Sequence, residues 1–193
     1  MIAASKMPLK MEGRPSVFTV PACADPLDTA NWSPLIEGKN IVCVGMYDSM
    51  LHMLLRDFDD WQPASMAIGS GGDLSLSAGS YIATPTRQPP THSDTAMRRQ
   101  NFVAPIVQVI PGNTVTRTAV YVAIVRPDDA NTGSVEAPYI NELGLLATNG
   151  TLLAHYVTPE DLTNATRPSL KYAKSNLQWL VIKWEIEFTG VEP

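Results

Sequence analysis

The sequence predicts a mainly β protein on three observations. Residues 178–188 alternate strictly, with Leu180, Ile182, Trp184, Ile186 and Phe188 on one face, as a strand with one buried face requires. Several segments rich in β-branched residues are separated by proline, glycine and asparagine turns. Only one segment has a helical period. We therefore expect an antiparallel β-sandwich of jelly-roll-like form, with one packed amphipathic helix and an extended N-terminal arm.

Composition is typical of a folded chain. The 193 residues are 45% hydrophobic and 17% charged, which suits one domain with a single core. The net charge of −5 argues against a nucleic-acid partner, since phosphate binding needs clustered cations. No run is long and apolar enough to span a membrane. Residues 1–14 carry four charged side chains, so we expect no secretion signal and no membrane partner.

Residues 1–39 are predicted to form the extended arm. They contain five prolines, Pro8, Pro15, Pro21, Pro26 and Pro34, each of which lacks a ladder donor and favours extended backbone before it. Val17, Phe18 and Val20 form at most one short strand. We expect these three residues and Trp32 to contact neighbouring subunits during assembly, because a long arm is usually ordered by what it lies on.

The β-sandwich domain is predicted to occupy residues 40–193 and to begin with a helix at about 46–60. Its apolar residues recur at helical spacing: Tyr47, Met50, Leu51, Leu54, Phe58 and Trp61. We expect this stripe to pack on the sheet. A short strand at 64–69 follows, and residues 73–96 read as a long loop, which in a compact domain is usually functional or interfacial.

The remaining strands are expected at residues 101–110, 114–125, 139–147, 151–157 and 178–188. The pair Asn149-Gly150 lies between two of them and is a strong hairpin signal. Glu142 shares a strand face with Ile140, so burial would require a hydrogen-bonding or cationic partner. Gly144 indicates a bulge or a close approach. Residues 159–175 form a polar connection.

Candidate chemical sites are weak. Residues 69–72 are Gly-Ser-Gly-Gly without the Lys and Ser/Thr of a P-loop. His52, His92 and His155 lie far apart, with no carboxylate or cysteine at a metal-site spacing. No Gly-x-Ser-x-Gly nucleophile motif occurs. We therefore predict no enzyme activity, no cofactor and no metal. Whether Cys23 and Cys43 pair stays open, with reduced buried thiols favoured.

An ordered set of phrases resembles virion structural proteins of tailed bacteriophages, in particular tail-fibre and tail-associated proteins. The phrases are residues 40–42 (Asn-Ile-Val) before the helix, 65–71 (Ser-Met-Ala-Ile-Gly-Ser-Gly), 91–97 (Thr-His-Ser-Asp-Thr-Ala-Met), 139–146 (Tyr-Ile-Asn-Glu-Leu-Gly-Leu-Leu), 149–154 (Asn-Gly-Thr-Leu-Leu-Ala) and the last strand. Leu143 stands where that signature has isoleucine, and the glutamate and arginine that usually follow the threonine-rich phrase are matched only by Arg98 and Arg99.

The resemblance implies a non-enzymatic structural component of a tailed-phage virion. We expect it in the tail, neck or fibre-attachment region, associating with itself and with other phage structural proteins after synthesis in the host cytoplasm. Two alternatives stay open. The arm would suit a capsid decoration protein, and a receptor- or carbohydrate-binding module would show exposed aromatic side chains, whereas Trp179 and Trp184 lie in a strand with a core pattern.

Overall fold

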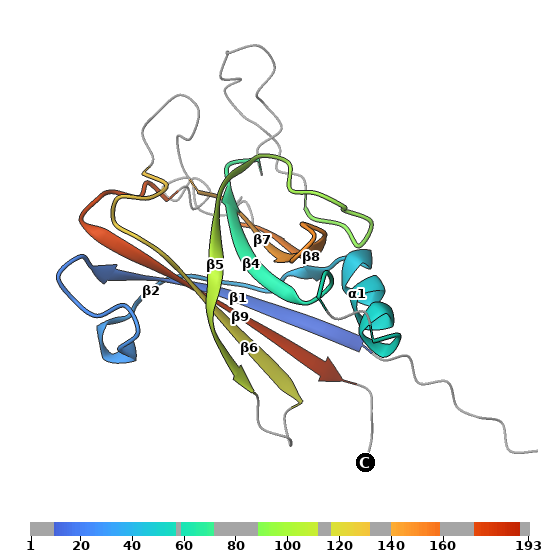
Figure 1. Cartoon of the computed structure of the whole chain (residues 1–193). Coiled ribbons are helices and arrows are strands. Elements are labelled where there is room, and N and C mark those ends of the chain that lie inside the picture. The colour runs from blue at the N-terminus through green and yellow to red at the C-terminus, as the bar shows by residue number, and fades with distance from the viewer. Residues whose placement is uncertain are drawn as a thin grey trace, which may run out of the picture.

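The computed structural model describes residues 10–56, 59–71, 89–111, 117–131, 140–158 and 172–189. The described residues are mainly β, as predicted, with one α-helix (Figure 1). The elements are β1 (Lys10–Pro21), η1 (Thr29–Asn31), β2 (Ser33–Glu37), β3 (Ile41–Val42), α1 (Val44–Leu54), β4 (Pro63–Gly69), β5 (Gln100–Pro111), β6 (Thr118–Val125), β7 (Glu142–Ala147), β8 (Leu152–Val157) and β9 (Gln178–Thr189).

These strands form one curled antiparallel sheet, a half-barrel, in the order β2-β1-β9-β6-β5-β4-β7-β8-β3. Strand β5 belongs to two parts of it, because residues 100–105 pair with β4 and residues 106–111 pair with β6. We call β2, β1, β9, β6 and the second part of β5 half A. The first part of β5 with β4, β7, β8 and β3 is half B.

One continuous segment, residues 33–42, links the two ends of this sheet. Its first part, β2, pairs with β1, and the Gly38 and Asn40 amides then donate to the carbonyls of Pro15 (3.1 Å) and Gly13 (3.0 Å). Its last part, β3, pairs with β8. Both ends of the sheet are therefore held by the same stretch of chain.

The main core lies between the two halves. It joins inward residues of half A, such as Val17, Ile182 and Trp184, to inward residues of half B, such as Met66 and Leu145. The face predicted for the last strand is confirmed for its central residues, since Leu180, Ile182, Trp184 and Ile186 are at most 2% exposed. Phe188 is half-buried.

The prediction of an extended arm is wrong for most of residues 10–37. Strand β1 is an interior strand that pairs with β9 along its whole length, from Lys10 opposite Thr189 to Pro21 opposite Gln178. Pro15 is tolerated because its carbonyl side faces Gly38, beyond the regular β1–β2 register of residues 16–19, so its missing N–H removes no ladder bond. Residues 1–9 lie outside the described part.

Helix α1 exists but ends earlier than predicted, and of its predicted stripe Met50 packs on the main core while most of the others do not. The buried residues are Gly45, Met46 and Ser49. A Cβ at Gly45 would lie 2.4 Å from the Leu152 carbonyl oxygen, so small residues allow the helix backbone to approach β8 closely. The larger predicted residues then face outward: Tyr47, Leu51 and Leu54 are 44%, 55% and 80% exposed.

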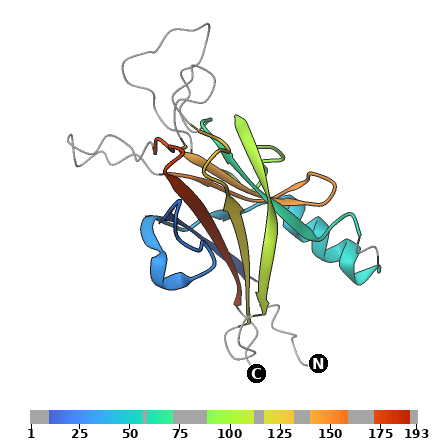
Figure 2. The same cartoon turned by 60° about the vertical axis from the view of Figure 1, so that its left-hand side comes forward.

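Several local predictions are confirmed. Strands β4, β5 and β8 lie where the sequence placed them, and Gly150 turns the β7–β8 hairpin with a φ of +83°. Residues 72–88, 112–116, 132–139 and 159–171, which include much of the predicted loop and connection, lie outside the described residues. Figure 2 shows the loop of residues 22–32 and α1 on opposite sides of the sheet. Within the described part, no helix has the length and apolar character needed to cross a membrane.

Candidate functional site

The outer face of half B is covered by residues 89–99, which we call the cover segment. Every residue of β7 and β8 is buried, which requires cover on both faces of these strands. Met97 packs with Cys43, Ala67, Leu146 and Leu152 on the outer side. A Cβ at Gly144 would lie 2.6 Å from the Met97 sulfur, so the close approach at this glycine comes from a side chain and not from the backbone that the sequence predicted.

Glu142 is a fully buried carboxylate under the cover segment, with 0% exposure. Its Oε1 accepts a hydrogen bond from the Arg98 amide (2.7 Å), and its Oε2 accepts from the amides of Gly71 and Arg99 (3.1 Å each). The sequence prediction that a buried Glu142 needs partners is therefore confirmed. Three of its contacts are backbone donors brought from two separate loops.

His155 lies beside Glu142 and is also fully buried. Its Nε2 is 2.8 Å from Glu142 Oε1, and its Nδ1 is 2.7 Å from Asp94 Oδ2. An ionised carboxylate can only accept hydrogen bonds. One ring nitrogen faces each of the two carboxyl groups, and the ring thereby bridges them.

Asp94 holds the cover segment to this charge cluster. Its side chain also accepts from the Thr91 amide (3.0 Å) and the Thr91 hydroxyl (2.6 Å). Burial raises the pKa of Asp94, but the bonds from Thr91 and His155 outweigh it, and the pKa lies below its ordinary value. Burial likewise raises the pKa of Glu142, and the bonds from His155 and the Arg98 and Arg99 amides bring it below its ordinary value.

We call Asp94, His155 and Glu142 the carboxylate–histidine clamp. Its ring nitrogens are both occupied, and two of its three side chains have no exposed surface. Burial raises the pKa of the nearby Cys43 thiol to about 12, and the negative charge of Asp94 contributes a smaller part of this increase. A thiol with so high a pKa is a poor nucleophile. This geometry fixes the cover segment in place.

The clamp corrects the sequence interpretation of the histidines. His155 has two carboxylate partners, from residues 61 and 13 positions away, although no spacing in the sequence indicated them. His92 instead contacts the Val42 carbonyl oxygen through Nδ1 (2.7 Å), and His52 stacks on Trp61 with centroids 4.1 Å apart. Within the described ranges, no group of three His, Cys, Asp or Glu is placed to hold a metal ion.

The residues expected to contact other subunits pack within the chain. Val17 and Val20 are 2% and 0% exposed, so they have no surface for a neighbour, and their assignment as assembly contacts is wrong. Phe18 and Trp32 contact each other, with ring centroids 4.8 Å apart, and are half-buried; their role in assembly stays a prediction.

The remaining predicted positions are now placed. Cys43 is buried and Cys23 is exposed, and both are free thiols, which corrects the expectation that both are buried. Gly71, in the glycine-rich stretch, donates to Glu142 through its amide. Trp179 is half-buried on the face opposite Trp184, so the core assignment holds for Trp184 alone.

Four of the phrases that carry the phage resemblance meet at this clamp. Gly71, Asp94, Met97, Glu142 and Gly144 come from three of them, and the fourth leads directly into His155. Comparison of the chain with protein-family models, with curated proteins and with solved structures gave no match.

Proposed function

We propose that the protein is a non-enzymatic structural component of a tailed-phage virion, in its tail, neck or fibre-attachment region, and that it acts through contacts between subunits. The observation that carries this proposal is the exposed face of α1. Five large apolar residues, Val44, Tyr47, Leu51, Leu54 and Leu55, are between 44% and 80% exposed. A contiguous exposed apolar surface commonly marks a protein interaction site.

The construction of the fold supports an assembly role. The polar groups of the clamp bind one another, and the sequence phrases on which the expectation of a virion protein rests supply most of them. The finer description of the fold as a jelly-roll-like sandwich belongs to the same proposal, and the shared core between the two halves supports it.

Locating the protein in virions tests this proposal directly. Antibodies raised against the purified chain should label purified virions of the phage that encodes it, at the tail, neck or fibre-attachment region. Labelling of infected cells without labelling of intact or disrupted virions would overturn the proposal. Labelling over the capsid surface would replace it with the capsid decoration alternative.

A matched pair of variants tests the role of the exposed helix face. The double change Leu51→Glu and Leu54→Glu places charge on that face and should prevent incorporation into virions. Both side chains are mostly exposed, so the melting temperature should change little. Leu177→Glu, at a site 71% exposed on the opposite half, is the control and should be incorporated normally. Normal incorporation of the double variant would show that α1 makes no subunit contact.

A further inference from the structure

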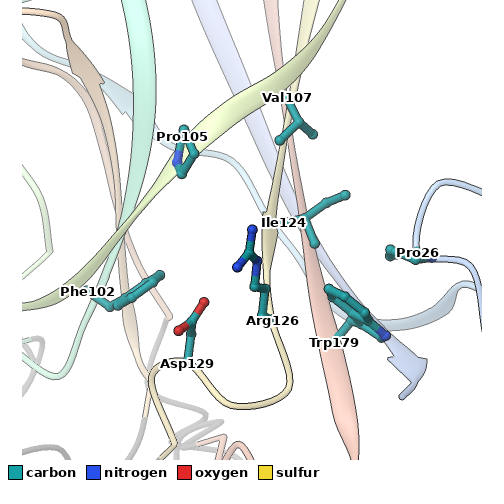
Figure 3. Close-up of a pocket in the computed structure, with 8 residues that line it drawn as sticks. All are labelled: Pro26, Phe102, Pro105, Val107, Ile124, Arg126, Asp129 and Trp179. Atoms are coloured by element: carbon teal, nitrogen blue, oxygen red, sulfur yellow. The ribbon is translucent and has the colours of Figure 1, made fainter. Parts of the chain in front are cut away.

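A pocket of about 390 Å³ lies where β5, β6 and β9 meet the loop of residues 22–32 (Figure 3). Ligand sites in proteins commonly measure about 300–1,000 Å³, so this pocket suits a small molecule. Its walls include the indole of Trp179 and the ring of Phe102, which Figure 3 shows on opposite sides of Arg126 and Asp129. Val107 and Ile124 add apolar surface to the lining.

The aromatic wall at Trp179 is held in place by the chain. The Trp179 Nε1 donates to the Ala22 carbonyl (3.2 Å), so its polar atom is already occupied and its ring face is what the pocket uses. The adjoining loop is itself fixed, because Trp32 Nε1 donates to the Pro26 carbonyl (2.9 Å) and the Leu27 amide donates to Asp25 (2.9 Å). The wall is therefore preformed.

The polar groups of the pocket are also positioned. Arg126 and Asp129 lie on the turn after β6, where the Asp129 amide donates to the Arg126 carbonyl (3.1 Å). The buried Lys174 holds this turn through its Nζ, which donates to the Pro127 carbonyl (2.8 Å) and Asn131 Oδ1 (3.2 Å). Among the residues described, neither the Arg126 guanidinium nor the Asp129 carboxylate has a side-chain hydrogen bond or an ion pair within 4.0 Å.

These groups define the chemistry of a fitting ligand. The guanidinium is a donor only and the ionised carboxylate is an acceptor only. A purely apolar ligand would desolvate both charges without replacing their hydrogen bonds, and a simple anion would pair with Arg126 but leave Asp129 without a donor. A vicinal pair of hydroxyls can accept from Arg126 and donate to Asp129 at the same time, while the apolar face of the ring that bears them lies on an aromatic side chain.

We propose that this pocket binds a neutral saccharide of one or two rings, with a sugar face on Trp179 or Phe102 and hydroxyls on Arg126 and Asp129. This inference is independent of the proposed place in a virion. A phage structural protein and a protein from any other source would use these residues in the same way.

Titration of the full chain with neutral sugars tests the site. Glucose, galactose, mannose and their N-acetyl derivatives, with one disaccharide of each hexose, are added to ¹⁵N-labelled protein, and the indole N–H and backbone shifts are followed. Saturable shifts of the Trp179 indole and of residues 124–129 are expected for at least one sugar, with a Kd near 1 mM or tighter. Absence of saturable shifts up to 50 mM for every sugar would overturn the proposal.

Variants assign the binding to this pocket. Arg126→Gln and Trp179→Ala should each weaken the affinity at least tenfold, whereas Arg56→Gln and Tyr47→Ala, at exposed sites on and after α1, should leave it unchanged. Arg126 is exposed and without a side-chain partner among the described residues, so its variant separates binding from folding. Unchanged affinity in Arg126→Gln, or tighter binding of glucuronate than of glucose, would refute a neutral-sugar site here.

Discussion

The two halves of the sheet are stabilised in different ways. Half A has a charged outer face at one end of β1 and β9, where Arg14 contacts Glu187 (2.8 Å) and Glu185 (3.9 Å) at partly exposed positions. At the other end of these strands the outer face is an apolar cluster that includes Val20 and Val181. Half B buries β7 and β8 on both faces and places the ionic clamp beneath the cover segment. Exposed ion pairs contribute little to stability, whereas loss of one partner from a buried pair is costly.

Because of this difference, half A should tolerate substitutions better than half B does. Half A depends on apolar packing between strands, which accepts many side chains of suitable volume. Half B requires three segments that are distant in the sequence to bring matching donors and acceptors to His155 and Glu142. A change in the outer charges of half A should be mild, and a change in the clamp should loosen a whole segment of half B.

The largest effect is expected from removal of β1. A chain that lacks residues 1–21 loses the strand between β2 and β9. Strand β9 would then have an unpaired edge, and the core would lose the inward-facing residues that β1 supplies. We expect no cooperative thermal transition and collapsed amide dispersion in the NMR spectrum. A cooperative melt close to that of the full chain would show that β1 is dispensable, as an extended arm would be.

Trp184→Ala tests the apolar core of half A. Trp184 is fully buried, so its truncation should lower the free energy of unfolding by about 3–5 kcal/mol. The neighbouring change Glu185→Ala, on the outer face, should lower it by less than about 0.5 kcal/mol. Denaturant melts compare the two, and equal losses would contradict the assigned faces of β9.

Glu142→Gln tests the clamp of half B. Loss of hydrogen bonds to a charged group should lower the free energy of unfolding by about 1.5–3 kcal/mol. Glu187→Gln is the matched control, because its carboxylate pairs with Arg14 at the surface; it should cost no more than about 1 kcal/mol. Limited proteolysis should cut the cover segment faster in the first variant only. Equal losses of unfolding free energy in the two variants would show that the clamp of half B is no more important for stability than the surface ion pair of half A.

Acidification should loosen half B while leaving half A largely intact. The pKa values of Asp94 and Glu142 lie below their ordinary values in the folded protein, so the stability they contribute is present above the unfolded values of about 3.9 and 4.3. It is lost as the pH falls from there through the lower folded values. Hydrogen exchange, corrected for its intrinsic pH dependence, should show reduced protection of the Arg98 and Arg99 amides at pH 3. Unchanged protection would contradict this linkage.

The sequence predicted those parts of the fold whose pattern is local. The alternation of residues 180–186 and the turn at Asn149-Gly150 are each contained in a few neighbouring residues. Strand β1 contains the short strand predicted at Val17, Phe18 and Val20 but is much longer. Its full length was missed because Pro15 and Pro21 count against a strand wherever the neighbouring strand is unknown. The stripe on α1 was assigned to the wrong side because periodicity identifies an apolar face but does not identify the face with small residues that can approach a sheet.

The clamp was missed because of a shift in register. Near the turn, Leu146 pairs with Leu152, but after the irregularity between Leu145 and Leu146 the pairing places Gly144 opposite His155. A one-residue shift exchanges the two faces of a strand. An unshifted hairpin would have placed His155 on the face toward the core, away from Glu142. Only the signal of a buried carboxylate at Glu142 was available from the sequence.

The pairing of Lys10 with Thr189 has a mechanical consequence. Strands β1 and β9 are antiparallel neighbours, so the first residue of β1, Lys10, lies beside the last residue of β9, Thr189. A force that pulls these two ends apart would load the hydrogen bonds between the strands one after another, from Lys10 toward Pro21, instead of sharing the load among all of them. The fold should therefore open at low force when it is stretched through these two ends, whatever its resistance to heat or denaturant.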